Sequence, residues 1–581
     1  MIKRLAACIR EYKRPTILTP VCMVGEVVCE CTIPLLTADL INAIQNGCTM
    51  QTILSFGLKL FVIAMLSLGF GSLSGWFAAE AAAGFAKNLR HDLYYQVQGF
   101  SFANIDRFST SSLVTRLTTD VTNIQNAFMM CIRIAVRAPM MLVFAVVMSV
   151  RVGKQLALIF AGIMPVLGFA LFLMIRSALP LFEAVFKKYD ALNNSVQENV
   201  QAMRVVKSFV REDYETEKFS AASDSVRKDF LKAEKILALN SPAMQFCVYT
   251  SMILISYFAA KLIVTSGGTY LGVGSLTSMI TYSMQILMSL MMLSMIFVML
   301  TMAQASGKRI CEVLDETSSL QNPAEPVYDV KNGDVDFDHV NFKYSAAAKR
   351  SALSDVDFHV RSGQTVGIIG GTGSSKTSLV QLICRLYDVT DGSVRVGGVD
   401  VRQYDLETLR NQVAVVLQKN VLFSGTIKEN LRWGDANASD EELQRACELA
   451  CADEFIQQMP DKYDTYIEQG GTNVSGGQKQ RLCIARALLK KPKILILDDS
   501  TSAVDTKTDA KIRAALRSEI PETTKFIIAQ RISSIQDADL ILVLEGGQID
   551  AMGTHEQLLA SNRIYREVYE SQNKAGGADN G

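Results

Sequence analysis

Six long apolar segments in the first part of the chain constrain its fold more than any other feature. A helix that crosses a bilayer needs about 20 largely apolar residues. The segments that meet this requirement span residues 15–42, 53–79, 127–150, 156–179, 241–265 and 274–303. The apolar excess ends near residue 305. The sequence therefore predicts an α-helical membrane domain followed by a domain of another kind.

Lysine and arginine positions predict how these helices are oriented. Residues 1–14, 87–126 and 176–238 are rich in both, whereas the connections on the other side contain only Arg151 and Lys154. Positive charge stays on the cytoplasmic side of a membrane. The basic start lacks the short apolar region and cleavage site of a removable signal peptide. We expect a multi-pass protein of the cell membrane with both termini cytoplasmic.

The two long cytoplasmic connections keep apolar residues three or four apart, as in VQENVQAMRVVKSFV. This spacing is typical of helices. We therefore expect the membrane helices to continue into the cytosol and turn there.

Four of the charged residues inside the expected spans form pairs spaced four residues apart. Glu26 and Glu30 share one helix face, and Arg133 and Arg137 share another. Such charges are rare in membranes. The favoured interpretation is that they pair between helices or lie near a membrane boundary. The alternative is that they line a cavity for a cationic substrate.

Methionines crowd the sixth span, at Met284, Met288, Met291, Met292, Met295 and Met299. Flexible thioethers suit an adaptable apolar surface, but ordinary packing or lipid contact is the commoner role of methionine and is the one expected.

Composition excludes other classes of protein and site. Lys+Arg and Asp+Glu both number 58, without the basic surplus of a nucleic-acid-binding protein. The 12 cysteines lack the spacing of a zinc site or disulfide framework and are expected to be buried thiols.

A polar stretch, NPAEPVYDVKNGD, separates the membrane domain from short β-rich runs that alternate with helical stretches. This alternation predicts a mainly parallel sheet covered by helices. The expected boundaries are 1–320 for the membrane domain, 321–334 for a linker, 335–572 for a cytosolic α/β domain and 573–581 for a disordered tail.

The sequence GGTGSSKT lies between a predicted strand and helix, as a phosphate-binding loop requires. The expected nucleotide-binding residues are Gly370, Gly371, Thr372, Gly373, Ser374, Ser375, Lys376, Thr377 and the adjoining Ser378. Backbone N–H groups can surround a phosphate, Lys376 can neutralise it, and the Thr377 hydroxyl can bind Mg²⁺. Ser375 stands where the pattern has glycine, so a Cβ must be accommodated there.

With this loop, the stretches NVSGGQKQRLCIARALL and ILILDDSTSAVD make nearly the whole chain resemble the ATP-binding cassette (ABC) exporters. The resemblance is to a half-transporter, with six membrane helices fused to one P-loop nucleotide-binding domain. It implies ATP and Mg²⁺ as cofactors, and a transported substrate that we expect to be amphipathic but that the sequence does not identify. It also implies that the signature residues contact ATP held by a second chain, namely Ser475, Gly476, Gly477 and Gln478.

The resemblance assigns further roles residue by residue. Tyr344 would stack on adenine, Gln418 would reach Mg²⁺ and the attacking water, and Asp505 would communicate across the domain interface. Segments 111–125 and 204–219 would be the turns that couple nucleotide state to the membrane helices.

Two residues depart from the family pattern at the expected catalytic site. Asp498 fits the Mg²⁺-side aspartate, but Asp499 replaces the catalytic glutamate. In the switch segment FIIAQRISS (526–534), Gln530 replaces a histidine that touches the γ-phosphate in this family. One methylene fewer withdraws the carboxylate by roughly 1.5 Å, and a misplacement of about 1 Å can cost on the order of 10²-fold in rate. Glutamine cannot become cationic, so it stabilises transition-state charge less well.

A weakened pocket beside an intact signature predicts the degenerate-site subunit of a heterodimeric exporter of the bacterial multidrug type. Its partner would be a second, different half-transporter in the same lipid bilayer. Two alternatives remain open: a homodimer with two slow sites, and an ATP-binding membrane sensor that does not transport.

Overall fold

The computed structural model describes residues 1–266, 271–345, 348–500 and 503–576. It divides into two compact units, unit 1 (Met1–Gln98 and Ser109–Glu316) and unit 2 (Gly99–Phe108 and Thr317–Gly581). Of the expected tail, residues 573–576 belong to the last helix, and residues 577–581 lie outside the described residues.

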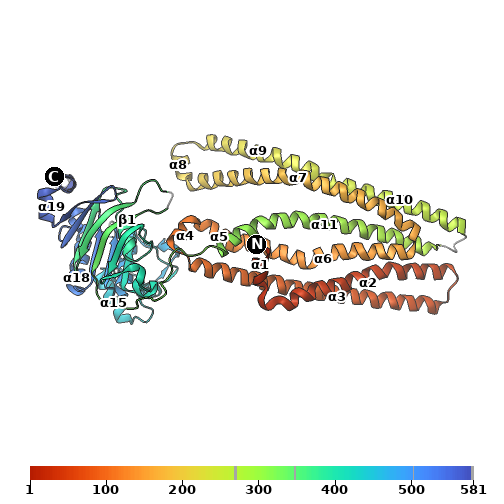
Figure 1. Ribbon diagram of the computed structural model, residues 1–581, viewed down its shortest axis with the longest axis horizontal. Helices are drawn as coiled ribbons and strands as arrows, with labels where there is room; N and C mark the ends of the chain where they lie inside the picture. The colour runs from red at the N-terminus through yellow and green to blue at the C-terminus, as the bar shows by residue number, and fades with distance from the viewer. Residues whose placement is uncertain (267–270, 346–347, 501–502, 577–581) are drawn as a thin grey trace. The chain divides into compact units, whose positions relative to one another are not determined.

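Helices make up the regular structure described for unit 1 (Figure 1). They are α1 (Ile2–Ala6), α2 (Lys13–Gln45), α3 (Met50–Gln98), α5 (Thr110–Thr115), α6 (Val121–Val152), α7 (Lys154–Gln201), α8 (Met203–Ser208), α9 (Glu212–Ala238), α10 (Asn240–Ser266) and α11 (Val273–Leu314), with short turns η1 (Ala7–Tyr12) and η2 (Arg116–Asp120). Among the described residues, 6 helical stretches are long and apolar enough to cross a membrane. The six expected spans are therefore confirmed.

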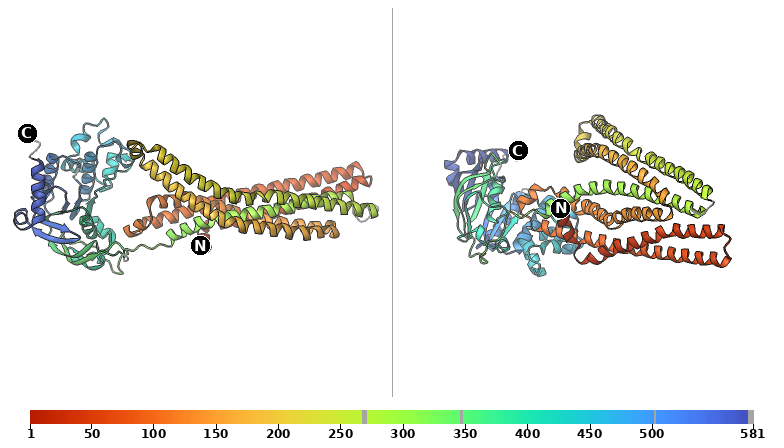
Figure 2. Two further views of the ribbon diagram at one scale, coloured as in Figure 1. Left: turned by 90° about the horizontal axis from the view of Figure 1, so that it is seen from above. Right: turned by 45° about the vertical axis from the view of Figure 1, so that its right-hand side comes forward.

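The longest helices extend well beyond a bilayer. Helix α3 has 49 residues and α7 has 48. At about 1.5 Å per residue each is roughly 70 Å long, against a hydrocarbon core of about 30 Å. Helix α7 runs beside α9 and α10 (Figure 2). The long connections are therefore continuations of the membrane helices, as their periodicity predicts.

Three of these charged residues, Glu26, Glu30 and Arg137, form an ion cluster between α2 and α6. Arg137 donates from Nη1 to Glu26 Oε1 at 2.7 Å, and from Nη2 to Glu30 Oε1 and Oε2 at 2.8 and 2.9 Å. Glu26 lies against Gly71 of α3, where a Cβ would come within 3.2 Å of its Oε2. The pairing interpretation therefore holds for Glu26, Glu30 and Arg137.

The methionines of α11 do not pack inside this chain as a group. Five of them are exposed on unit 1, namely Met284, Met288, Met291, Met292 and Met295. Packing within the chain therefore does not account for them, which leaves contact with lipid, substrate or a second chain.

Unit 2 combines two main sheets with surrounding helices. Its strands are β1 (Val335–Phe342), β2 (Leu353–Val360), β3 (Thr365–Gly370), β4 (Asp391–Val396), β5 (Val399–Asp400), β6 (Val413–Val416), β7 (Gly425–Thr426), β8 (Tyr466–Ile467), β9 (Ile494–Asp498), β10 (Thr524–Ile528), β11 (Leu540–Glu545) and β12 (Gln548–Gly553). Its helices are α4 (Phe102–Arg107), α12 (Lys376–Ile383), α13 (Leu406–Gln412), α14 (Ile427–Leu431), α15 (Asp440–Leu449), α16 (Asp453–Ile456), α17 (Gly476–Leu489), α18 (Thr506–Glu519), α19 (His555–Ser561) and α20 (Arg563–Gly576).

In the described part of unit 2, the larger sheet has the strand order β12-β11-β3-β10-β9-β6 and the smaller one β2-β1-β4-β5. All pairs from β11 to β6 are parallel, and β12 is antiparallel to β11. This confirms the mainly parallel sheet expected from the sequence.

Strand β9 shows why the central strands read as continuous apolar runs. Ile494 and Ile496 face the core shared with α12 and the smaller sheet, whereas Leu495 and Leu497 face the core shared with α15, α17 and α18. A parallel strand covered on both faces needs apolar side chains at every position. Asp498 at its end is therefore an exception that points to function.

Candidate functional site

The candidate site lies where four neighbouring parallel strands end. The phosphate-loop sequence follows β3, Gln530 follows β10, Asp498 and Asp499 end and follow β9, and Gln418 follows β6. The carboxyl ends of parallel strands lie at one edge of a sheet, where ligands of open α/β folds bind. Motifs more than 150 residues apart in sequence therefore meet in one place.

The loop between β3 and α12 has the backbone of a glycine-rich phosphate loop. Ser375 has φ = 68°, ψ = 27°, in the left-handed region that favours glycine. This is why the family pattern has glycine here. Added Cβ atoms at Gly371 and Gly373 would meet nothing within 4 Å, so the loop borders open space at these two positions, both of which line a cavity.

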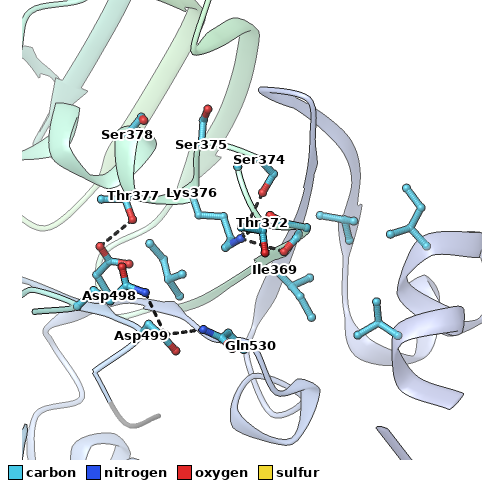
Figure 3. Close-up of a pocket in the computed structure, with 18 of the residues that line it drawn as sticks. Ile369, Thr372, Ser374, Ser375, Lys376, Thr377, Ser378, Asp498, Asp499 and Gln530 are labelled. Atoms are coloured by element: carbon cyan, nitrogen blue, oxygen red, sulfur yellow. Dashed lines mark hydrogen bonds between the residues drawn. The ribbon is translucent and has the colours of Figure 1, made fainter. Parts of the chain in front are cut away.

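Lys376 lies across this loop (Figure 3). Its Nζ donates to the carbonyl oxygens of Gly370 and Gly371, both at 2.9 Å, and to Ser374 Oγ at 3.3 Å. Burial lowers the pKa of the Lys376 ammonium, while the charges of Asp498 and Asp499 act to raise it. The Lys376 ammonium can exchange these hydrogen bonds for bonds to a phosphate that enters the loop.

Thr377 and Asp498 form a pair of oxygen ligands suited to Mg²⁺. Thr377 Oγ1 donates to Asp498 Oδ2 at 2.9 Å. Burial raises the pKa of Asp498 and the charge of Asp499 adds to the rise, while the Thr377 hydrogen bond and Lys376 oppose it. A buried carboxylate next to a second carboxylate fits a divalent cation, which favours oxygen ligands.

Asp499 is held by two side-chain amides (Figure 3). Gln530 Nε2 donates to its Oδ2 at 2.7 Å, and Gln418 Nε2 donates to the same oxygen at 3.4 Å. The backbone of Asp499 is also constrained, with φ = 48° and an N–H bond to the Ile528 carbonyl at 3.0 Å. Two carboxamides therefore contact the same oxygen of Asp499.

These residues line one cavity of about 580 Å³, within the usual 300–1,000 Å³ of small-molecule sites. The cavity is lined by every predicted loop residue from Gly370 to Ser378, together with Gln418, Asp498, Asp499 and Gln530. Glycine backbone, a lysine and two acidic oxygen ligands fit a Mg²⁺–nucleoside triphosphate. Sequence reasoning missed three apolar lining residues from α20: Ile564, Tyr565 and Val568.

Tyr344 lies beside the phosphate-loop helix. Its hydroxyl is 2.7 Å from Ser378 Oγ, and its ring meets the Tyr387 ring edge-on at 5.1 Å between centroids. The Tyr344 side chain is exposed enough to stack on a planar base. Its placement is compatible with the expected adenine contact.

The signature begins helix α17 and does not line this cavity in the part of the chain described. Ser475 is the N-cap: its Oγ accepts from the Gln478 N–H at 3.3 Å, and Gln478 Oε1 accepts from the Ser475 N–H at 2.9 Å. Asp505 likewise caps α18, accepting from the Thr508 N–H at 2.9 Å. The start of α17 can bind an anion, but among the described residues it does not lie at the nucleotide cavity.

A short helix that the sequence reasoning did not identify belongs to unit 2. Helix α4 lies just before the segment 111–125 expected to couple the domains, and Asp106 on α4 accepts from the Tyr387 hydroxyl at 2.6 Å. Its N-cap pairs Ser101 with Asn104 in a capping box. That pattern, Ser followed three residues later by an amide, is the signal that could have located the helix.

Comparison with protein families gives two matches, which together span most of the chain. Residues 16–303 match the ABC transporter transmembrane region. Residues 353–502 match the ABC transporter domain, which contains the phosphate loop, the signature and the aspartate pair.

Several relatives are similar over nearly the full length. An uncharacterized ABC transporter ATP-binding protein of Bacillus subtilis, YfiB, is 37% identical over 95% of both chains. The ATP-dependent lipid A-core flippase of Aromatoleum aromaticum is 32% identical over 89% of this chain and 86% of its own. A solved structure of a bacterial Atm1-family ABC exporter with ATP bound has a TM-score of 0.82, covers 97% of this chain and 99% of its own, and is 24% identical.

Proposed function

The chain belongs to the ABC transporter family, and on that premise we propose that it is the ATP-holding half of a heterodimeric exporter. It is an ABC exporter half-transporter whose ATPase domain drives transport across a membrane. The proposal concerns the division of labour: this chain's own pocket retains ATP, and its signature completes the fast pocket of a different half-transporter.

The observation that carries the proposal is the environment of Asp499. In an active pocket the residue after the Mg²⁺-side aspartate orients the attacking water. Here one carboxylate oxygen accepts from both Gln530 and Gln418. A short side chain held in this way is poorly placed to reach and activate water, and neither amide can supply positive charge to the transition state.

ATP binding itself is supported by the rest of the pocket. The open loop, Lys376 and the Thr377–Asp498 pair would hold Mg²⁺–ATP, with Gln418 reaching the metal and Tyr344 the adenine. Bound Mg²⁺ would neutralise charge on the phosphates. Affinity without rapid hydrolysis gives long residence of ATP.

The signature supports the second half of the proposal. Ser475, Gly476, Gly477 and Gln478 keep the family sequence, and the capped start of α17 presents N–H groups that suit a γ-phosphate. We expect the partner to carry a glutamate after its Mg²⁺-side aspartate, a histidine in its switch segment and an altered signature. ATP binding would then bias an equilibrium between inward and outward access.

The membrane setting of the proposal follows the charge pattern. We place the chain in the cell membrane, with both termini and the helix extensions on the cytoplasmic side. Residues 1–320 are the membrane domain, 321–334 the linker and 335–572 the nucleotide-binding domain. An amphipathic substrate is supported by the exposed methionines of α11 and by a relative named as a lipid A-core flippase.

Reconstitution tests the proposal. The chain alone in nanodiscs is expected to bind ATP with little hydrolysis. With the correct partner half-transporter, hydrolysis should appear and should fall far more with Ser475→Ala than with Lys376→Ala, because only Ser475 acts at the partner's pocket. Robust hydrolysis by this chain alone, abolished by Lys376→Ala, would remove the case for an obligate, different partner. ATP binding without ATP-dependent flux of any amphipathic probe in sealed vesicles would indicate a sensor.

A further inference from the structure

The last helix of the described chain forms one wall of the nucleotide cavity. Ile564, Tyr565 and Val568 of α20 line it together with the phosphate loop and Gln530. None of the three belongs to a motif of the sequence. Helix α20 therefore contributes to this site although the family pattern assigns it no role there.

Helix α20 is fixed to unit 2 at its start. Tyr565 is fully buried, its hydroxyl is 2.7 Å from His555 Nδ1, and its N–H donates to Asn562 Oδ1 at 2.8 Å. Asn562 Nδ2 in turn donates to Asp550 at 2.6 Å. Burial and hydrogen bonds together hold the helix in one place.

At the far end of α20, Gln572 binds the backbone of the switch segment. Its Nε2 donates to the Gln530 carbonyl oxygen at 2.8 Å, and its Oε1 accepts from the Ile532 N–H at 2.9 Å. One carboxamide thus engages the backbone on both sides of Arg531. The same segment carries the Gln530 side chain, which donates to Asp499 at 2.7 Å.

The position of the Gln530 side chain depends on these backbone hydrogen bonds, because the residue is not buried. Gln530 and Arg531 are exposed, whereas Ile532 is buried. An exposed side chain loses little by rotating away, so its position depends on how firmly its own backbone is held. Gln572 holds this backbone through the two hydrogen bonds described above.

We propose that Gln572 is a positioning residue for Gln530, and that α20 is thereby a working part of the nucleotide pocket. By fixing the switch backbone, Gln572 keeps the Gln530 amide at the end of the cavity where a third phosphate would lie. It therefore sets how strongly the pocket prefers a nucleoside triphosphate over a diphosphate. The inference rests on the nucleotide site proposed above.

The test is binding of a non-hydrolysable ATP analogue and of ADP, each with Mg²⁺, to the full chain in nanodiscs. Gln572→Ala is expected to reduce the preference for the triphosphate about three- to tenfold, the worth of one hydrogen bond, by weakening triphosphate binding alone. Gln572→Glu keeps the acceptor for the Ile532 N–H but cannot donate to the Gln530 carbonyl, so a reduction is expected there too. Ser571→Ala, at the exposed neighbouring position, is the matched control and should change nothing.

A second measurement separates positioning from a merely structural role. In a Gln530→Ala background, Gln572→Ala should have no further effect on the preference, because the side chain it positions is gone. Equal weakening of both nucleotides, an unchanged preference, or the same effect in both backgrounds would overturn the inference. Failure of the wild-type chain to bind either nucleotide would instead overturn the proposed function, and this inference with it.

Discussion

At the scale of single residues, the site combines groups that favour binding with groups that disfavour hydrolysis. Lys376, Thr377 and Asp498 retain the chemistry of a nucleotide pocket, whereas Asp499 and Gln530 are tied to each other. Sequence comparison with the family pattern was enough to identify both substitutions. It could not reveal that they hydrogen-bond, because that depends on where β9 and β10 end.

Ser375→Gly should stabilise unit 2. The left-handed backbone at this position costs a residue with a Cβ about 1–2 kcal/mol, and part of the gain is lost to the extra freedom of glycine in the unfolded chain. We expect a net gain of about 0.5–1 kcal/mol, measured by chemical denaturation of the full chain. An equal or lower stability would show that the seryl side chain makes a compensating contact.

Asp498 should make stability depend on pH. Burial raises its pKa in the folded chain, so the folded state binds this proton more tightly than the unfolded state. The contribution of this proton to the free energy of unfolding is fully present below the ordinary aspartate pKa of about 3.9. It is lost as the pH rises through the pKa that Asp498 has in the folded chain. The melting temperature of the nucleotide-free chain relative to Asp498→Asn should therefore fall as pH rises from about 4 to 8. A flat difference would contradict the assignment.

At the scale of elements, strong periodicity made the long helices and the central strands predictable. Helices α3 and α7 and strand β9 follow directly from apolar spacing. Helix α4 did not, since it is only 6 residues long and its packing partner, Tyr387, lies far away in sequence. The wall formed by α20 was likewise missed, because amphipathic spacing says which face is buried but not what it faces.

Tyr387→Phe tests the attachment of α4 to the rest of unit 2. The change removes one hydrogen bond to the Asp106 carboxylate, worth about 1.5–3 kcal/mol, and keeps the ring beside Phe102 and Tyr344. Amide hydrogen exchange of residues 99–108 should accelerate at least tenfold. Exchange unchanged from wild type would mean that apolar packing alone holds α4.

Removal of Arg137 tests the ion cluster in the membrane domain. Arg137→Met leaves two neighbouring carboxylates unpaired and should cost about 3 kcal/mol, seen as a lower melting temperature in nanodiscs. The combination with Glu26→Gln and Glu30→Gln should restore most of that stability. If the single variant were as stable as wild type, water or a second chain would have to compensate the charges.

At the scale of the whole molecule, both domains and their order were predictable from composition and motifs. The pairing of subunits was not, because the described residues show only that the signature does not line its own chain's cavity, which does not identify a partner. A dimer formed by this chain alone would contain only pockets with Asp499, each completed by an intact signature.

Single-turnover hydrolysis of radiolabelled ATP by the full chain in nanodiscs tests the central claim most directly. The wild-type chain should hydrolyse ATP no faster than Asp499→Asn. Asp499→Glu combined with Gln530→His should be faster on the order of 10²-fold, because it restores both reach and charge. Wild-type turnover as fast as that of the double variant would contradict the account.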